Sequence, residues 1–305
     1  MVSAPTLIQA VINGILIGGI YGLVSIGVTL IFGVVKFVNF AHGEFLMLAM
    51  FVTWALAAPQ QLHTVLPWFP QLPAIDPLLT IVVTVPLLFA FGVLVQQVLF
   101  RRVIGGSDLP QIFLTFALSL LLTNLALVTF KGDVRTVTAP YTDATLNIAN
   151  EIFISYTRLF AFAMSVLLTA GLGLFLTRTD LGQAMRAAAQ DREVAMLVGI
   201  DPDHVYRMAV GLASALAAAG GTLIMPFFVV HPHVGTSFGL LAFSVVILGT
   251  LGDVRGAFLA GLLIGVAESL GIQFIGADSG RIVVFLVLLL TLIFRPSGLF
   301  GARRA

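Results

Sequence analysis

Residues Arg178 to Arg207 read RTDLGQAMRAAAQDREVAMLVGIDPDHVYR, and nearly everything on either side of them is apolar. These 30 residues hold nine of the chain's 29 charged side chains, of which 15 are basic and 14 acidic. A charged segment between apolar runs of membrane length must lie in water, where it can meet a soluble partner. The stretch, called the island below, therefore predicts a docking segment that is exposed beside a membrane-embedded body.

The composition around the island is that of a membrane protein. Hydrophobic residues make up 59% of the chain and charged residues 10%, whereas soluble domains carry about 25% charged residues. Apolar runs near 20 residues recur, and each can cross a ~30 Å hydrocarbon layer as a helix. The runs do not alternate apolar with polar residues, as barrel strands would. We expect an all-α polytopic membrane protein, with residues 1–305 forming one transmembrane domain.

Three function classes lose support on composition alone. The net charge of +1 gives no case for nucleic-acid binding. The absence of cysteine excludes disulfides, thiol catalysis and Cys-ligated zinc. The phosphate-binding pattern Gly-x4-Gly-Lys-Ser/Thr does not occur, so the chain is not expected to bind ATP by that route.

Eight or nine membrane spans are expected. The run Phe238–Leu251 has only about 14 residues, which is short for a full crossing, so it is either a short span or a re-entrant segment. The runs are Leu7–Gly33, Phe45–Ala58, Leu78–Phe100, Leu109–Phe130, Ile152–Thr177, Val205–Val230, Phe238–Leu251, a run from Gly256 to about Phe274, and Ile282–Phe294.

The orientation follows from Lys and Arg in the short loops, which are enriched on the cytoplasmic side. Alternation from a cytoplasmic island places 11 of the 15 basic residues inside. These are Lys36, Arg101, Arg102, Arg178, Arg186, Arg192, Arg207, Arg255, Arg295, Arg303 and Arg304, against Lys131, Arg135, Arg158 and Arg281 outside. The polar stretch Lys131–Glu151 and the proline-rich residues 59–77 become outer loops. We expect a multi-pass protein of a bacterial inner membrane, with its N-terminus periplasmic and its C-terminus cytoplasmic.

Within the island, Gln183–Val198 is rich in helix-forming residues and predicts one short amphipathic helix. Its apolar stripe is Val194, Leu197 and Val198. Gly199 stands where a helix ends in a left-handed residue, and Asp201-Pro202 is typical of the N-cap and first residue of the next helix. An unstructured linker would favour Ser, Gly and Pro, so docking is favoured over a linker without a partner.

The first span carries Gly14, Gly18 and Gly22, four residues apart along one helical face. Such a face lets another backbone approach closely. Packing against another helix of the same chain is the favoured interpretation, and a subunit interface is the alternative.

A few polar residues fall in or next to the apolar runs. Asn39, His42 and Glu44 precede the second run, and they are either a cap with headgroup-level side chains or a polar constriction at the inner mouth of a pathway. Glu268 lies well inside its run, so its carboxyl group must face the bundle interior, where it can line a pathway or serve as a buried hydrogen-bonding group.

Four segments give the chain a family resemblance. Asn39–Glu44, Gly182–Ile200, Gly249–Gly256 and Arg295–Gly301 closely resemble, in the same order, segments of the permeases of bacterial branched-chain amino acid ABC importers, and within them the LivH type. The resemblance covers about residues 7–301 and implies the fold of an ABC importer permease. It implies as partners a second, LivM-type permease, two cytoplasmic ATPase subunits that hold ATP and Mg, and a periplasmic substrate-binding protein. This chain would then be a transport subunit that is not an enzyme and binds no cofactor.

The resemblance also implies that residues 178–204 form a cytoplasmic coupling loop seated on the ATPase. The acidic residues follow the alanines here, unlike the Glu-Ala-Ala loop of other importers, so the role is carried over to the segment. Its candidate residues are Gly182, Arg186, Ala188, Ala189, Asp191, Arg192, Glu193, Gly199 and Asp201. Related permeases serve urea, short amides or small carboxylates, which stay open as substrates, and a stand-alone secondary carrier is a further alternative.

Overall fold

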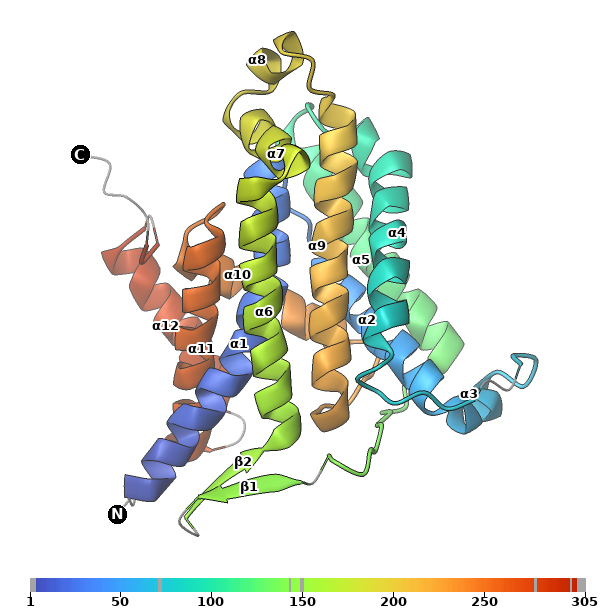
Figure 1. Cartoon of the computed structure of the whole chain (residues 1–305), viewed down its shortest axis with the longest axis vertical. Coiled ribbons are helices and arrows are strands. Elements are labelled where there is room, and N and C mark those ends of the chain that lie inside the picture. The colour runs from blue at the N-terminus through green and yellow to red at the C-terminus, as the bar shows by residue number, and fades with distance from the viewer. Residues whose placement is uncertain are drawn as a thin grey trace.

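The computed structural model describes residues 4–70, 73–142, 144–148, 151–276, 279–296 and 298–300. The chain forms an elongated helical bundle (Figure 1). One end of the bundle carries two short helices of the island, α7 (Asp180–Gln190) and α8 (Arg192–Leu197), and is called the island end. The opposite end carries the beginning of the chain.

Nine apolar helices of the described chain build the bundle. Six of them are long and apolar enough to cross a membrane, and α2 with the following α3 (Pro59–Val65), bent by 107°, makes a seventh candidate. The last two, α10 and α12, have 16 and 15 residues. The nine are α1 (Ala4–Val35), α2 (His42–Ala57), α4 (Ile81–Val98), α5 (Asp108–Phe130), α6 (Tyr156–Arg178), α9 (Pro202–Ile224), α10 (Val234–Gly249), α11 (Val254–Ile275) and α12 (Gly280–Phe294). The all-helical polytopic class is confirmed, and the expected eight or nine spans slightly exceed the six or seven found by length and composition.

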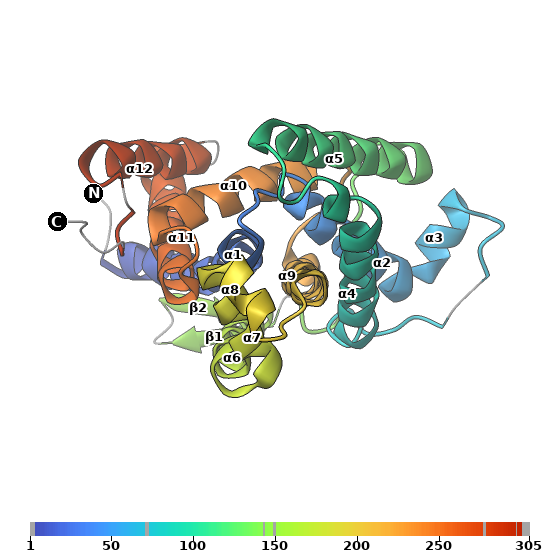
Figure 2. The ribbon, with the colours of Figure 1, turned by 90° about the horizontal axis from the view of Figure 1, so that it is seen from above.

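The short helix α10 crosses the bundle. At its beginning, Ser237 accepts a hydrogen bond of 3.2 Å from Arg281, which lies at the start of α12, away from the island. At its other end, Gly252 lies against Gly33, near the end of α1 at the island end. Because α9 ends at one side and α11 begins at the other, α10 transfers the chain between them. Figure 2 shows α10 running obliquely beside α11.

Helices α1 and α9 form the centre of the bundle, and most of their residues are buried, whereas less than a third of the residues in the most apolar part of α4, α5 and α6 are buried. The glycines of α1 explain its central place. A Cβ atom added at Gly14 would lie 2.5 Å from the Cα of Val266, and one at Gly18 would lie 2.7 Å from the oxygen of Gly261, both on α11. The glycine face therefore packs inside the chain, which confirms the favoured interpretation.

The loop between α5 and α6 contains a small antiparallel sheet of β1 (Thr145–Ile148) and β2 (Ile152–Ser155). The expected start of the fifth span at Ile152 is therefore wrong, and α6 begins at Tyr156. Residues 152–154 are Ile-Phe-Ile, whose β-branched and aromatic side chains suit a strand as well as a span. Gln9 of α1 bonds both backbone groups of Phe153, at 2.7 and 2.8 Å, and holds the strand beneath the bundle.

Basic residues separate between the two ends as expected. Arg101, in the short 3-10 helix Phe100–Arg102 (η1), forms a 2.8 Å ion pair with Asp203 at the island end. At the opposite end, the backbone of Arg135 pairs with Val230, and Arg158 lies over the ring of Phe227 in the 3-10 helix Met225–Phe227 (η2). Arg303 and Arg304 lie outside the described residues.

Candidate functional site

The island folds as two helices, which corrects the single helix expected over Gln183–Val198. Asp191 interrupts it, because its Oδ1 accepts hydrogen bonds from the backbone amides of Glu193 at 2.9 Å and Val194 at 3.1 Å. Asp191 is therefore the N-cap of α8. Aspartate competes with the helical backbone for such bonds, and it favours caps over helix interiors.

Helix α7 is held firmly against the end of α6. Thr179 caps α7 by accepting a 3.1 Å bond from the amide of Gly182, and it donates a 2.7 Å bond to the carbonyl of Phe175. A Cβ atom at Gly182 would come within 2.3 Å of that carbonyl oxygen, so only glycine allows this approach. Arg186 donates a hydrogen bond to the carbonyl of Leu176, while Met185 is fully buried. Helix α7 therefore has a fixed orientation relative to α6.

The turn from α8 into α9 has the expected caps. Gly199 has φ of +85°, in the left-handed region, and Asp201 accepts a 3.0 Å bond from the amide of Asp203 as the N-cap of α9. Asp203 in turn forms the ion pair with Arg101 after α4. These contacts join the turn after α8 to the beginning of α9 and to the segment that follows α4.

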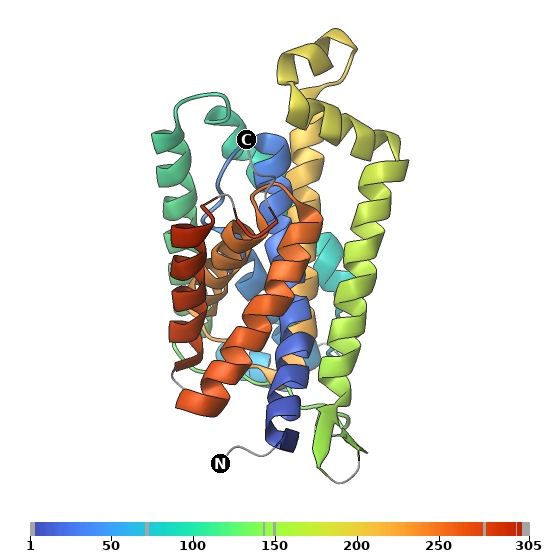
Figure 3. The ribbon, with the colours of Figure 1, turned by 90° about the vertical axis from the view of Figure 1, so that its left-hand side faces the viewer.

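The apolar stripe of α8 projects away from the bundle. Val194, Leu197 and Val198 are 55%, 86% and 72% exposed. Ala195 on the opposite side of the same short helix is buried, and it fixes which side faces outward. In Figure 3 α8 is the outermost element of the island end. An apolar stripe of this kind at the tip of a projecting helix suits contact with a partner.

The expected coupling residues fall into three groups. Gly182 and Ala188 are buried, and Asp191, Gly199 and Asp201 shape the helix ends and turns, so these five hold the island in its form. Arg192 and Glu193 are exposed, and the guanidinium group of Arg192 lies 5.8 Å from the ring centre of Tyr206. Arg186 and Ala189 line a groove beside α6. The ion pair between Arg101 and Asp203 was not predicted, because nothing in the sequence pairs the end of α4 with the start of α9.

Helix α2 begins inside the bundle. His42, its first residue, makes a 3.1 Å hydrogen bond from Nε2 to the carbonyl of Val24, and no part of His42 is exposed. Val24 lies 11 residues before the end of α1, which corresponds to about 16 Å along a helix. Asn39 accepts a 3.0 Å bond from the amide of Ala41, which is itself the N-cap of α2, so Asn39 shapes the turn before the helix and is not its cap as expected. His42 therefore lies well inside the bundle, away from the end of α1.

Glu44 is 1% exposed and only partly bonded. Its Oε1 accepts a 3.3 Å bond from the hydroxyl of Thr236 on α10, while its Oε2 has no hydrogen-bond partner among the described residues. Thr236 itself is exposed on the surface of α10. A Cβ atom at Gly43 would lie 2.0 Å from the carbonyl oxygen of Gly235, so the glycine pair lets α2 approach α10 closely. The side chain of Thr236 therefore lies between the carboxylate of Glu44 and the exposed face of α10.

Glu268 lies on α11 and contacts α1 at another residue than His42 does. Its carboxylate accepts a hydrogen bond from Tyr21 of α1, and Arg281 is close enough to interact electrostatically. Tyr21 and Val24 are three residues apart on α1, so Glu268 and His42 contact neighbouring turns of that helix. Tyr21 as the partner of Glu268 could not be found from sequence spacing.

Comparisons with known proteins agree with this architecture. The family model described as "Branched-chain amino acid transport system / permease component" matches residues 10–292. The chain is 31% identical to the high-affinity branched-chain amino acid transport system permease protein BraD of Pseudomonas aeruginosa, over 96% of this chain and 95% of that protein. It is 29% identical to LivH of Salmonella typhimurium, with the same coverage of both chains.

A more distant relative is the probable branched-chain amino acid transport permease protein LivH of Methanocaldococcus jannaschii, at 24% identity over 92% of this chain and 88% of that protein. No solved structure matches the chain. The family model covers nearly the whole bundle, from the glycine face of α1 to α12, and the island lies within it. The chain belongs to the family of branched-chain amino acid transport permeases.

Proposed function

We propose that the chain is the permease subunit of an ATP-driven importer for branched-chain or related small amino acids, and that it forms half of the translocation pathway. In this proposal residues 178–204 face the cytoplasm of a bacterium and transmit the movement of two ATPase subunits. A second, LivM-type permease supplies the other half of the pathway, and a periplasmic binding protein delivers the solute. ATP and Mg bind to the ATPases.

The observation that carries the proposal is the form of the island. Helix α7 is fixed on α6 by its cap and by Gly182, and α9 begins at the capped turn that follows α8. A push on the exposed stripe of α8 therefore displaces the ends of two long helices together. A flexible loop would absorb the same push.

The docking surface is tested by placing a charge on the stripe. Leu197→Asp leaves the bundle unchanged, because Leu197 is 86% exposed, and it puts a carboxylate into the proposed apolar contact. We expect the tagged chain to lose most of its co-purifying ATPase subunits and its substrate-stimulated ATP hydrolysis. Leu251→Asp, at an exposed leucine of the same end outside α8, is the matched control. Equal recovery of the ATPases with both variants would refute docking through α8.

The pathway is proposed to pass along the face of α10 that carries Thr236, with Asn39, His42 and Glu44 behind it and Glu268 nearer the outer end. Polar groups below the membrane surface are costly and mark such routes. The chain has no native cysteine, so Thr236→Cys gives a single reactive site. Transported amino acid should slow the labelling of Thr236→Cys by a small thiol reagent, and it should leave the labelling of Leu259→Cys on α11 unchanged. If the amino acid changes the labelling rate at neither position, the pathway does not pass along this face of α10.

The substrate is proposed from the relatives, whose names specify branched-chain amino acids. Gentle purification of the tagged chain from its native membrane should recover a second permease and the ATPases. The binding protein of that system can then be screened with leucine, isoleucine, valine, urea and short amides. A chain that purifies alone yet moves solute in liposomes would contradict the importer and favour a stand-alone carrier.

A further inference from the structure

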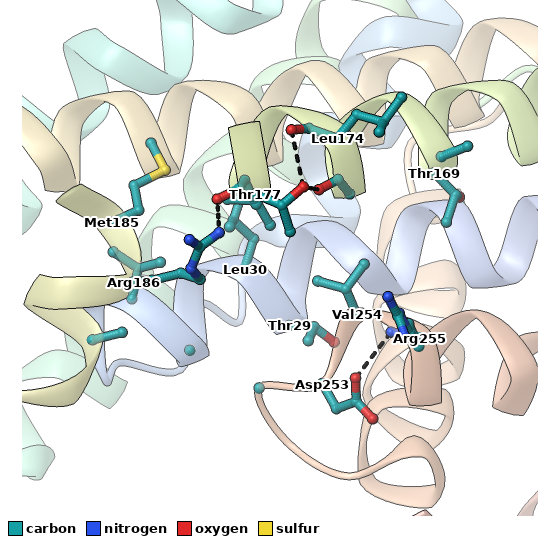
Figure 4. A pocket seen from close by; sticks show the side chains of 17 residues that line it. Thr29, Leu30, Thr169, Leu174, Thr177, Met185, Arg186, Asp253, Val254 and Arg255 are labelled. Carbon is teal, nitrogen blue, oxygen red and sulfur yellow. Dashed lines mark hydrogen bonds between the residues drawn. The ribbon is translucent and has the colours of Figure 1, made fainter. Parts of the chain in front are cut away.

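A groove of about 690 Å³ lies beside the island, on the flank of the bundle. Its walls are the last turns of α6, the second half of α7 and the first residues of α11, and its floor is the end of α1. Figure 4 shows Arg186 and Arg255 on opposite sides of the pocket, with Thr29 between them and Thr169 farther from Arg186 along α6. Arg186 and Ala189 of the proposed coupling segment line this groove, but neither docking through α8 nor the proposed pathway along α10 occupies it.

Two hydroxyl groups in the groove lack partners. Thr29 is 0% exposed, and its hydroxyl makes no hydrogen bond in the described part of the chain; the buried hydroxyl of Thr169 makes none either. One turn earlier on the same helices, Ser25 and Ser165 bond the carbonyls of Tyr21 and Ala161 in the usual way. Thr29 and Thr169, which line the groove, lack such a bond to the carbonyl four residues earlier. Buried hydroxyl groups are nearly always bonded, so an acceptor from a ligand is expected here.

Three charged residues, called the rim below, line the groove: Arg186 from α7, and Asp253 and Arg255 from the beginning of α11. Arg186 and Arg255 are both exposed, and neither forms an ion pair with a carboxylate among the described residues. Arg186 uses one nitrogen for the carbonyl of Leu176 and keeps its other donors. Asp253 lies beside Arg255, and its Oδ1 accepts a hydrogen bond from the amide of Arg255 as the cap of α11. The rim therefore offers two guanidinium groups and one carboxylate.

The surroundings of the groove are lipid-facing in character. Leu174 on α6 is 61% exposed, and Leu259 and Leu263 on α11 are 45% and 48% exposed, on helices long enough to cross a membrane. The groove lies between these helices, and its charged rim comes from residues near the ends of the spans, where basic side chains of membrane proteins reach lipid headgroups. Apolar walls below a basic rim fit a molecule with an apolar chain and an anionic head.

We propose that this groove binds a phospholipid of the island-side leaflet. The phosphate is held by Arg186 and Arg255. The ester carbonyls, which lie deeper than the phosphate, accept hydrogen bonds from Thr29 and Thr169. An acyl chain follows the apolar wall of α6. Asp253 accommodates an ammonium head, so an ethanolamine lipid matches all three charged groups, and a glycerol lipid matches the two guanidinium groups.

The proposal is tested by native mass spectrometry of the full-length chain, together with whatever subunits co-purify, in the presence of phosphatidylethanolamine, phosphatidylglycerol or leucine. We expect one phospholipid to remain bound to the wild-type chain. The double variant Arg186→Ala/Arg255→Ala should bind it about tenfold more weakly or worse. Arg102→Ala, which removes an exposed arginine of the same end outside the groove, is the matched control and should bind as the wild type does.

A second variant separates lipid loss from misfolding. Ala170→Trp fills the groove from α6 without changing any charge, and it should expel the lipid while the chain still purifies as a bundle. Lipid bound equally by the double variant, by Ala170→Trp and by the wild type would overturn the proposal, and so would leucine that replaces lipid with the same dependence on the two arginines. The experiment measures lipid retention, so its result does not depend on whether the chain couples to an ATPase.

Discussion

Gly199 holds the turn between α8 and α9 in a backbone conformation that residues with a side chain avoid. Its φ is +85°, and no atom lies within 4 Å of the position that a Cβ would take. The constraint is therefore purely conformational. It was predictable from sequence because glycine after a helix-forming run, followed by Asp-Pro, is a common helix-turn-helix signal. Asp191 gave no such signal, because an aspartate within good helix formers also suits a helix surface.

Replacing Gly199 with valine should loosen the island and leave the bundle intact. The left-handed conformation costs a residue with a side chain about 1–2 kcal/mol, enough to reduce the population of the turn about fivefold or more. We expect substrate-stimulated ATP hydrolysis of the assembled importer to fall by a similar factor. Gly199→Asn, which tolerates this conformation, is the control and should stay close to wild type. Normal stimulated hydrolysis by Gly199→Val would show that the turn does not transmit the movement.

At the scale of elements, long apolar runs determine most of what was predictable. Each of the nine expected runs corresponds to one helix, because length and uniform apolarity together leave a membrane helix as the only solution. The ends were less predictable. The run beginning at Ile152 starts as a strand, and His42 begins α2 deep in the bundle, since tertiary contacts with Gln9 and Val24 decide both boundaries. The pairing of helices, such as α1 with α11, could not be predicted, because a helix that is apolar on all sides has no periodic pattern to identify its packing face.

The packing of α1 on α11 should be sensitive to a single methyl group. A Cβ atom at Gly18 would lie 2.7 Å from the carbonyl oxygen of Gly261, so Gly18→Ala forces two backbones apart and should destabilise the bundle by about 1–3 kcal/mol. Gly171→Ala on α6 meets nothing within 4 Å and should be neutral or slightly stabilising, because alanine favours helix. Thermal unfolding in detergent measures both. Equal melting temperatures for the two variants would contradict the close contact.

At the scale of the whole molecule, the two groups of basic residues lie at opposite ends, and the positive-inside rule then proposes which end faces the cytoplasm. The count of basic residues comes from the sequence alone, and the described part of the bundle places the two groups at its two ends. The groove beside the island was not predictable at this scale or any other. Its residues come from α1, α6, α7 and the start of α11, and nothing in their spacing brings Thr29 near Thr169.

The orientation is measurable with introduced cysteines, because the chain has none of its own. A membrane-impermeant thiol reagent should label Asp133→Cys, in the loop after α5, from outside intact cells. Glu193→Cys on α8 should react only in inverted vesicles. Both side chains are exposed, so access to the reagent depends on the side of the membrane alone. The reverse pattern would place the island in the periplasm and exclude coupling to a cytoplasmic ATPase.

The contact between Gly18 on α1 and Gly261 on α11 also bears on how the protein is made. Helix α1 leaves the ribosome before the other helices of the bundle, yet its partner α11 is synthesised more than 200 residues later. Until then the glycine face of α1 has no helix to cover it, and the bundle cannot close. We expect nascent chains that end before α11 to remain bound to the insertion machinery or to be degraded. In this protein, biosynthetic quality control therefore depends on a stripe of residues that have no side chains.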